Sequence, residues 1–414
     1  MVDTRVRIGS KYLVATALIL SAVALVVWPS APAAQSQRHG IENTQALGRF
    51  FKALDDMKRG RRLEPVRIAH YGDSHTAADI LTADIRRKLQ GEFGDGGPGY
   101  IIAKNPMTTP RKGVTSGATT GWTVDGIGKS AGNDGVYGLA GLSLTTTKAD
   151  ERMWLETSCN HFEVYYMRWP GAGTIDITVD GASVLDRPLS LNSQYPTPDY
   201  FLYDMPSSGN HRIEIRTTTA GRTRILGIVA EHIAPHSGVS YDVLGINGAR
   251  AVRILGWNLN ILADNIIERK PDLIIVAYGT NEVTDDNWTV ESYARTLTEI
   301  IDRFRRAAPD ASIIVFGPPD RADTPVAVTR MPEMLEAQRR AAKQAGAAYW
   351  CSFDAMGGVG SMNAWLSQGL GQGDKVHLTG AGYLKMGDMF YQDLMKAYTE
   401  FKPASPRSAA SATK

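Results

Sequence analysis

The sequence predicts an α/β fold, in which a doubly wound, mostly parallel sheet is flanked by helices and interrupted by an inserted β-sandwich or jelly-roll domain. Apolar runs bounded by turn residues, at 66–71, 272–278 and 312–319, alternate with amphipathic segments. Such runs are typical of strands that are buried on both faces of a parallel sheet. Between residues 105 and 240 the pattern changes to short segments of period two, rich in Gly, Ser and Thr. This change predicts a β-rich insert.

The first 34 residues form a segment of their own. Three basic side chains precede an apolar run at 12–28, and small residues follow at 31–33. A basic segment, an apolar segment and a small-residue site are the parts of a secretory signal peptide. The apolar run is also close to the lower limit for a membrane span. We therefore expect either a cleaved signal or a membrane tether through 12–28, with the rest of the protein outside the cytoplasm.

The chain then enters its first strand and helix. Residues 35–61 are predicted to form a polar linker with a short helix at 44–57. After the strand at 66–71, apolar residues recur every four positions through 76–93, which predicts an amphipathic helix. The glycines that begin at Gly94 end this pattern.

The remaining elements fall into two groups. Alternating apolar and polar residues predict strands inside the insert, and helical periodicity predicts helices after it. The strands are expected at 162–167, 174–181, 211–217 and 224–231, and the helices at 291–307, 333–345 and 383–398. The polar residues 401–414 are expected to be a disordered tail.

The order of these elements predicts one discontinuous α/β domain, made of residues 62–104 and 241–400, with 105–240 inserted as a β domain. The alternative is three consecutive domains. It is disfavoured because 62–104 contains one predicted strand and one predicted helix, which are too few to bury a core.

The charge balance bears on the class of partner. Lys and Arg total 45 and Asp and Glu total 43, for a net charge of +2. A balanced chain of this kind predicts no nucleic-acid partner.

Cysteine and histidine spacing gives no sign of a metal site. The two cysteines are Cys159 and Cys351. An exported protein permits a disulfide between them, but Cys351 lies in a predicted buried strand, so two free thiols agree equally well with the sequence. His232 and His236 are four residues apart, and Pro235 between them argues against the helix that would align both on a metal ion. No metal or other cofactor is expected.

Four polar or glycine-rich stretches occur where a doubly wound sheet would gather them. They are GDSH at 72–75, GINGA at 245–249, GTNE at 279–282 and DKVH at 374–377. Ligands of parallel α/β sheets bind outside the carboxyl ends of the strands. We therefore expect these stretches to form one site.

Residue types and spacing in these stretches predict a nucleophilic serine. A serine hydroxyl needs a base within hydrogen-bonding reach, and the base needs a group that orients it. Asp374 and His377 are three residues apart, so the carboxylate can reach imidazole Nδ1 and leave Nε2 for Ser74. No G-x-S-x-G motif surrounds a strand–helix turn, which excludes the α/β-hydrolase nucleophile elbow as the template.

Acyl transfer also requires donors aimed at the developing oxyanion. Three candidates are the backbone N–H of Ser74, the backbone at Gly248 and the side-chain amide of Asn281. Gly245 lies three residues before Gly248 in the same stretch and is the alternative for that position.

Neighbouring polar residues have expected supporting roles. Asp73 is expected to hold backbone donors at the serine turn, Glu282 to do similar work beside Asn281, and His75 to be a structural neighbour of the site. The structural alternative for Ser74 is that it only caps the following helix.

The helix that follows Ser74 carries further charged residues. Asp79 and Asp84 are expected to be solvated, and the basic residues 86–88 to form an exposed face.

Taken together, the four stretches resemble the four blocks of the SGNH (GDSL-like) hydrolase superfamily, which carry a serine, a glycine, an asparagine and a histidine in this order. The resemblance covers 62–104 and 241–400. It implies Ser74 as nucleophile, His377 as general base and Asp374 as its orienting carboxylate. It also implies an oxyanion hole formed by the Ser74 N–H, the Gly248 N–H and Asn281.

A narrower resemblance concerns exported bacterial peptidoglycan O-acetylesterases, in which a β domain similar to a carbohydrate-binding module interrupts the hydrolase domain. GDSH and the residues that follow it, the long β-rich insert and the export signal are similar to that group. The likeness implies a periplasmic or cell-envelope enzyme whose partner is an O-acetylated glycan. Aromatic residues of the insert could bind sugar or fill its core: Trp122, Trp154, Tyr165, Tyr166 and Trp169.

Three functions therefore compete. The first is an exported serine esterase that removes O-acetyl groups from a glycan, with peptidoglycan as the expected substrate. The second passes the same acyl group to another acceptor, as an O-acetyltransferase on an envelope polysaccharide, or releases a longer acyl chain as a lipase or thioesterase. The third, from a different class, is a non-catalytic envelope protein that binds polysaccharide.

Overall fold

The computed structural model describes residues 40–106, 108–126, 134–235 and 237–401. All of them belong to one compact unit of the chain. The predicted signal or tether at 1–34 and the predicted tail after Phe401 lie outside these ranges. Within them, no helix is both long and apolar enough to cross a membrane.

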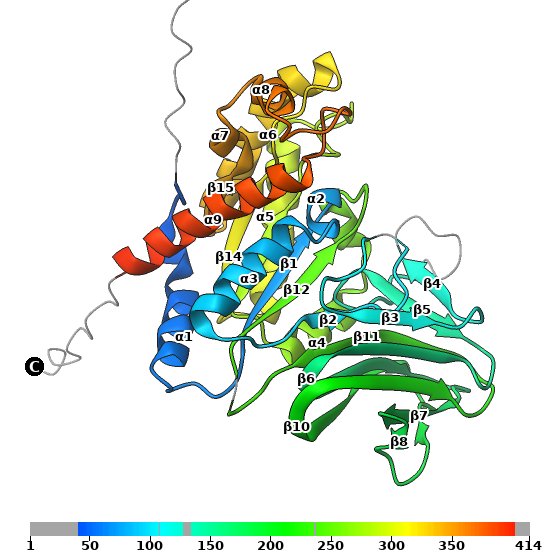
Figure 1. The fold of residues 1–414 in the computed structure, drawn as a ribbon. Coiled ribbons are helices and arrows are strands. Elements are labelled where there is room, and N and C mark those ends of the chain that lie inside the picture. The colour runs from blue at the N-terminus through cyan, green and yellow to red at the C-terminus, as the bar shows by residue number, and fades with distance from the viewer. Residues whose placement is uncertain (1–39, 107, 127–133, 236, 402–414) are drawn as a thin grey trace, which may run out of the picture. The chain divides into compact units, whose positions relative to one another are not determined.

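A five-stranded parallel sheet forms the first layer of the fold (Figure 1). The strand order is β12-β1-β13-β14-β15. The chain passes from β1 to the edge strand β12 and then crosses to the other side of β1, where β13, β14 and β15 follow in order. The strands predicted at 66–71, 272–278 and 312–319 are confirmed within two residues at each end. The bounds are β1 Val66–Gly72, β12 Val239–Gly245, β13 Leu273–Ala277, β14 Ser312–Gly317 and β15 Ala348–Cys351.

Helices cover both faces of this sheet, which confirms the predicted α/β class. Successive residues of β1 point to opposite faces, as the pleat requires. Ile68 packs in a core with α1, α3 and α9, whereas Ala69 and Tyr71 pack in a core with α4, α5 and α6. The bounds are α1 Gly48–Lys58, α3 Leu81–Phe93, α4 Leu259–Arg269, α5 Val290–Ala307, α6 Pro325–Gln344 and α9 Gly380–Glu400.

Short helices connect these layers. The segments α2 and η2 follow β1 and β12, where the site forms, and α7 and α8 follow β15. Their bounds are η1 Thr44–Leu47, α2 Ser74–Ala77, η2 Ala251–Gly256, α7 Ser352–Met356 and α8 Ser361–Ser367.

The β-rich region forms a second, ten-stranded antiparallel sheet. Its two longest strands, β6 and β10, pair along most of their length, with a register shift between Asp204 and Gly209. The strands run from residue 99 to residue 231, and the predicted division into domains stays a prediction. Their bounds are β2 Gly99–Ile101, β3 Thr115–Ala118, β4 Thr123–Gly126, β5 Leu142–Thr146, β6 Arg152–Arg168, β7 Thr174–Val179, β8 Ala182–Ser183, β9 Leu189–Ser190, β10 Thr197–Thr217 and β11 Thr223–Glu231.

Buried ion pairs join the two sheets. Glu231, the last residue of β11, is fully buried and accepts from Arg67 of β1 at 2.8 Å. It also pairs with Arg269 of α4 at 2.7 Å, and Arg269 reaches Asp242 of β12 at 2.9 Å. Burial alone would raise the pKa of Glu231, but the two guanidinium groups hold it well below its usual range. The cluster therefore stays charged and fixes the second sheet against the first.

The expectation that Asp79 and Asp84 are solvated is wrong. Asp79 is 2% exposed and has a φ of 45°, which interrupts the predicted helix at 76–93 and separates α2 from α3. Its carboxylate accepts from Arg86 at 3.2 Å and from the Lys112 N–H at 2.9 Å. Asp84 is buried and pairs with Lys88 at 2.9 Å. Arg86 is also buried, so the predicted exposed basic face does not include it.

The aromatic residues of the second sheet mainly fill its core. Trp122, Tyr165, Tyr166 and Trp169 are buried in the cluster between the strands, which supports the core interpretation over a sugar-binding surface. Trp154 is partly exposed, with the Arg212 guanidinium 4.9 Å from its ring centre.

The alternative of two free thiols is confirmed for the cysteines. Cys159 and Cys351 are both buried and both free. Burial raises the pKa of each thiol to about 12, so both stay protonated at neutral pH.

Candidate active site

The pairing of β1 with β12 and β13 places three of the four predicted stretches at the same end of the sheet. Gly72, at the end of β1, is in register with Gly245 of β12 on one side and Ala277 of β13 on the other. The segments that follow these residues therefore leave the sheet at the same carboxyl edge. Glycine is required at Gly245 because an added Cβ would lie 2.3 Å from the backbone nitrogen of Ala77 in α2. The absence of a side chain there lets the serine turn pack onto β12.

The turn that carries Ser74 is capped by Asp73. The Asp73 carboxylate accepts from the His75 N–H at 3.0 Å, as expected for the residue before a helix. This finding contradicts the structural alternative in which Ser74 is the cap. The Ser74 hydroxyl is instead free to face the DKVH stretch.

Ser74, His377 and Asp374 form a continuous hydrogen-bonded chain. Ser74 Oγ lies 2.8 Å from His377 Nε2, and His377 Nδ1 lies 2.7 Å from Asp374 Oδ2. With the imidazole proton on Nδ1, facing the carboxylate, Nε2 accepts the hydroxyl proton of Ser74. This arrangement can deprotonate a serine during attack on a carbonyl carbon.

Asp374 is held as a carboxylate. Partial burial raises its pKa, but the His377 side chain and the N–H groups of Val376 and His377 donate to it and lower the pKa to about 2. A permanent negative charge at this position orients the imidazole and stabilises its protonated form.

Two of the three predicted oxyanion donors, Gly248 and Asn281, lie on loops that contact each other. Gly248 has a φ of 72°, and nothing lies within 4 Å of a Cβ placed there, so it sits in an open turn rather than against α2 as Gly245 does. Asn281 Nδ2 donates to the Ala249 carbonyl at 2.9 Å. This bond uses one of the two amide hydrogens, so the other can donate to a ligand.

Glu282 forms hydrogen bonds with both of these segments. Its buried carboxyl group accepts from the Ala251 N–H at 2.7 Å and from the Gly279 N–H at 3.1 Å. Burial raises the pKa of Glu282 to about 7, and these N–H groups oppose the rise. Glu282 therefore joins the segment after Gly248 to the loop that carries Asn281.

An ion pair that the sequence analysis missed joins these loops at the surface. Arg250 donates to Asp285 through Nε at 2.6 Å and through Nη2 at 2.7 Å. Each residue lies just after one of the four predicted stretches, but no spacing rule relates positions 35 apart in a single sequence. Sequence reasoning therefore had no signal for this pair.

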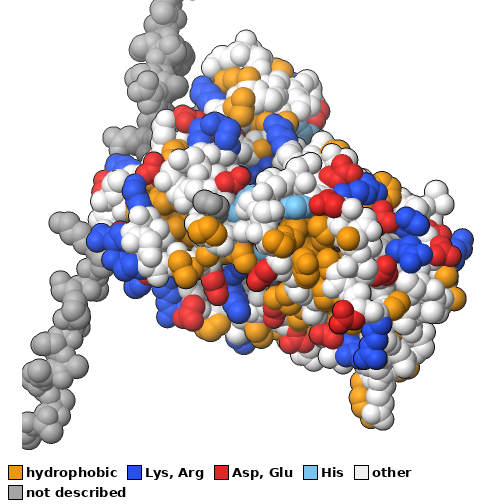
Figure 2. Space-filling view, turned by 60° about the horizontal axis from the view of Figure 1, so that its bottom comes forward, with side chains coloured by type: hydrophobic (Ala, Val, Ile, Leu, Met, Phe, Trp, Pro, Cys, Tyr) orange, Lys and Arg blue, Asp and Glu red, His pale blue; other side chains and the backbone are white. Residues whose placement is uncertain are grey.

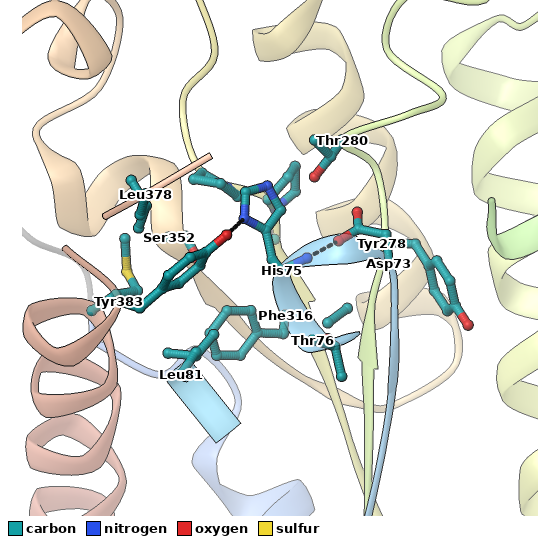
Figure 3. A pocket seen from close by; sticks show the side chains of 15 residues that line it. Asp73, His75, Thr76, Leu81, Tyr278, Thr280, Phe316, Ser352, Leu378 and Tyr383 are labelled. Atoms are coloured by element: carbon teal, nitrogen blue, oxygen red, sulfur yellow. Dashed lines mark hydrogen bonds between the residues drawn. The ribbon is translucent and has the colours of Figure 1, made fainter. Parts of the chain in front are cut away.

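Behind the serine turn lies a small cavity (Figure 3). Its volume is about 20 Å³, room for about one water molecule and too small for a long acyl chain. Asp73 and His75 line one side, and burial raises the pKa of Asp73 to about 6 while it lowers that of His75 to about 3. His75 is therefore neutral at physiological pH. Its ring lies 5.3 Å from the ring of His377, centre to centre.

Among the described residues, no group of three or more His, Cys, Asp or Glu side chains is arranged to hold a metal ion.

Comparisons with known proteins bear on both the fold and the site. The model of the GDSL-like lipase/acylhydrolase family matches residues 215–385. This range contains Gly248, Asn281, Asp374 and His377 but not Ser74. A solved structure described as "Peptidoglycan O-acetylesterase in action, 5 min" is similar over 87% of this chain and 99% of its own, with 25% identity and a TM-score of 0.72.

The chain resembles the SGNH (GDSL-like) hydrolases. Its α/β fold and the order of its blocks agree with that superfamily, and these findings support an esterase.

More distant likenesses are limited. A family two carbohydrate esterase from Cellvibrio japonicus is 14% identical over 69% of this chain and 98% of its own, with a TM-score of 0.30. The salicylyl-acyltransferase SsfX3 from a tetracycline biosynthetic pathway is 14% identical over 68% of this chain and 97% of its own, with a TM-score of 0.31. A sequence search of curated proteins found no match.

Proposed function

We propose that this protein is an exported serine esterase that removes O-acetyl groups from a glycan, with peptidoglycan as its substrate. The observation that carries the proposal is the chain of hydrogen bonds from Ser74 through His377 to Asp374. The substrate class rests on the similarity to the structure described as a peptidoglycan O-acetylesterase.

The reaction would proceed in two halves. Ser74 Oγ attacks the acetyl carbonyl carbon while His377 Nε2 takes the hydroxyl proton, and the carbonyl oxygen becomes an oxyanion. When the intermediate collapses, the C–O bond to the sugar breaks, and the sugar oxygen takes the proton from His377. Water then repeats the attack on the acetyl-serine with His377 as base, which releases acetate and restores Ser74.

The oxyanion would be bound by the Ser74 N–H, the Gly248 N–H and the Asn281 side chain. The first N–H groups of a helix are unpaired and favour negative charge, and α2 begins at Ser74. The hydrogen bond from Asn281 to the Ala249 carbonyl connects the two loops that carry the other two donors.

The charges on one face of the molecule bear on the class of partner. On the face shown in Figure 2, Lys and Arg side chains are interspersed with Asp and Glu side chains and form no single basic field. Nucleic-acid sites require a concentrated basic surface. Export rests on the basic, apolar and small-residue segments of 1–34 and would place the enzyme in the periplasm or cell envelope.

The test is acetate release by the purified protein from an aryl acetate and from O-acetylated peptidoglycan, with Ser74→Ala as control. Release from both substrates that disappears in the variant supports the proposal. Turnover of the aryl acetate with acetyl groups transferred to an added glycan acceptor would instead indicate a transferase. Glycan binding by a folded protein with no turnover of either substrate would indicate a non-catalytic function.

A further inference from the structure

His75, the residue after Ser74, makes a side-chain contact that the proposed reaction does not use. It is 7% exposed, and its Nδ1 atom lies 2.9 Å from the hydroxyl oxygen of Tyr383 (Figure 3). Tyr383 is itself 2% exposed and belongs to the first turn of α9. A buried contact thus connects the serine turn with the helix that follows the DKVH stretch.

The other end of this contact reaches the neighbour of His377. The backbone of Leu378 opposes the rise in the Tyr383 pKa that burial causes, so it lies close to the Tyr383 hydroxyl group. The hydroxyl hydrogen of Tyr383 can be donated to His75 Nδ1. The backbone N–H of His75 in turn donates to Asp73 at 3.0 Å. Tyr383 and His75 thus connect the first turn of α9, six residues after His377, with the turn of Ser74.

The protonation of His75 fits this direction of donation. Burial lowers its pKa to about 3, so it is neutral and carries a single N–H. If Nδ1 accepts from Tyr383, that hydrogen is on Nε2, which is buried and faces the cavity beside Asp73 and Thr280 (Figure 3).

We propose that Tyr383 and His75 are positioning residues that hold the loop of His377 in register with the turn of Ser74. The inference rests on the proposed function, since it assigns no contact with substrate to either residue. The 2.8 Å bond between Ser74 and His377 joins segments 303 positions apart in the chain. A second, buried connection between the same segments would keep that distance when substrate displaces the exposed side chains around it.

The chain offers a matched control. His70 in β1 is also buried, and its Nδ1 lies 2.7 Å from the hydroxyl oxygen of Tyr241 in β12. Burial likewise lowers the pKa of His70 to about 3. The two His–Tyr bonds are alike in chemistry and burial, but the bond of His70 lies within the sheet, before the strand ends at Gly72 and Gly245.

The experiment compares Tyr383→Phe with Tyr241→Phe in the purified protein. Each variant loses one buried hydroxyl group. We expect Tyr383→Phe to lower kcat for aryl acetate by about tenfold or more, with KM within about twofold, and to slow labelling of Ser74 by a fluorophosphonate to a similar extent. Tyr241→Phe should lose a similar amount of unfolding free energy but keep kcat. Equal kcat values in the two variants would overturn the proposal.

Two further experiments distinguish a failure of this inference from a failure of the proposed function. His75→Asn, which keeps an acceptor near the Nδ1 position, should retain more activity than His75→Leu; equal losses would count against the link. The ¹⁵N signals of His377 should move in Tyr383→Phe but not in Tyr241→Phe. That contrast would support the link even if the wild-type protein released no acetate, whereas unmoved signals in both variants would overturn it.

Discussion

Ser74 Oγ and His377 Nε2 lie 2.8 Å apart, although 302 residues and an entire ten-stranded sheet separate them along the chain. The two side chains meet because β1 ends beside β12 and β13, and because α9 packs against α3 on the same side of the parallel sheet. The site is therefore a product of the strand order.

Replacement of Asp374 should test the orientation of His377. In Asp374→Asn the side chain can no longer supply a negative charge at Nδ1 and can stabilise the wrong tautomer. We expect kcat for aryl acetate to fall by about 10³- to 10⁴-fold. The measurement is steady-state hydrolysis between pH 6 and 9. The neighbouring Lys375→Ala serves as control, and a loss of less than tenfold in Asp374→Asn would show that His377 is oriented by another group.

Asn281 should contribute to the rate rather than to substrate affinity. Asn281→Ala removes an amide donor from the proposed oxyanion hole, so kcat should fall by about 10²- to 10³-fold with little change in KM. Asn247, exposed beside Gly248, provides a control: Asn247→Ala should stay within about twofold of wild type. A rise in KM at constant kcat for Asn281→Ala would place this side chain in ground-state binding.

The Arg250–Asp285 pair should act through the loops it joins. Both side chains are about one-third exposed, so the pair should contribute less than about 1 kcal/mol to the free energy of unfolding. We expect Arg250→Ala, Asp285→Ala and the double variant to show similar losses of kcat, each of about fivefold to tenfold. The measurement is a double-mutant cycle on kcat; additive losses would mean that the two residues act independently.

Glu282 should make stability depend on pH. Its pKa in the folded protein is about 7, above the value of 4.5 expected when unfolded. Between these values the folded state holds a proton that the unfolded state has released, so the free energy of unfolding falls as pH rises from about 4.5 to 7. The loss attributable to this group is up to about 3 kcal/mol. Asp73, whose pKa is raised to about 6, adds to the same trend.

The check is urea unfolding of wild type and Glu282→Gln at several pH values. Because buried histidines titrate with the opposite sign in this range, the quantity of interest is the difference between the two proteins. That difference should shift in favour of the variant as pH rises and level off above pH 7. A constant difference would show that Glu282 is ionised throughout.

Removal of Arg269 should destabilise the junction of the two sheets. The guanidinium group is 1% exposed and is shared by the buried carboxylates of Glu231 and Asp242. Arg269→Met leaves both carboxylates short of a partner, and we expect a loss of about 3–5 kcal/mol in the free energy of unfolding. Arg305→Met, at a partly exposed pair on α5, should change it by less than about 1 kcal/mol. Similar effects of the two changes would mean that water reaches the cluster.

Local pattern was sufficient for much of the fold and the site. Apolar runs that fill both faces of a strand, and glycine or polar residues that end them, depend on neighbours in sequence. They predicted β1, β13 and β14 and placed the four stretches at the carboxyl edge. The spacing of Asp374 and His377 predicted their contact for the same reason, since three residues of a turn bring both side chains to one side.

Other features depend on partners far away in the chain. The segment of β12 carries Ser240 and Asp242 inside its apolar run and was not predicted as a strand; both side chains are buried because Arg269 reaches them from α4. Asp79 was expected to be solvated because the sequence shows no partner for its carboxylate. In the structure this carboxylate accepts from Arg86 and from the Lys112 N–H.

The sequence by itself thus determined the class of fold, the identity of the four blocks and the residues expected to carry the reaction, because these follow from periodicity and short spacing. Tertiary structure alone decided which polar groups are buried and that Tyr383 and Asp285 contact His75 and Arg250. Such contacts join residues separated by 35 to 308 positions. Their energies depend on desolvation by the surrounding core, which no local stretch of sequence specifies.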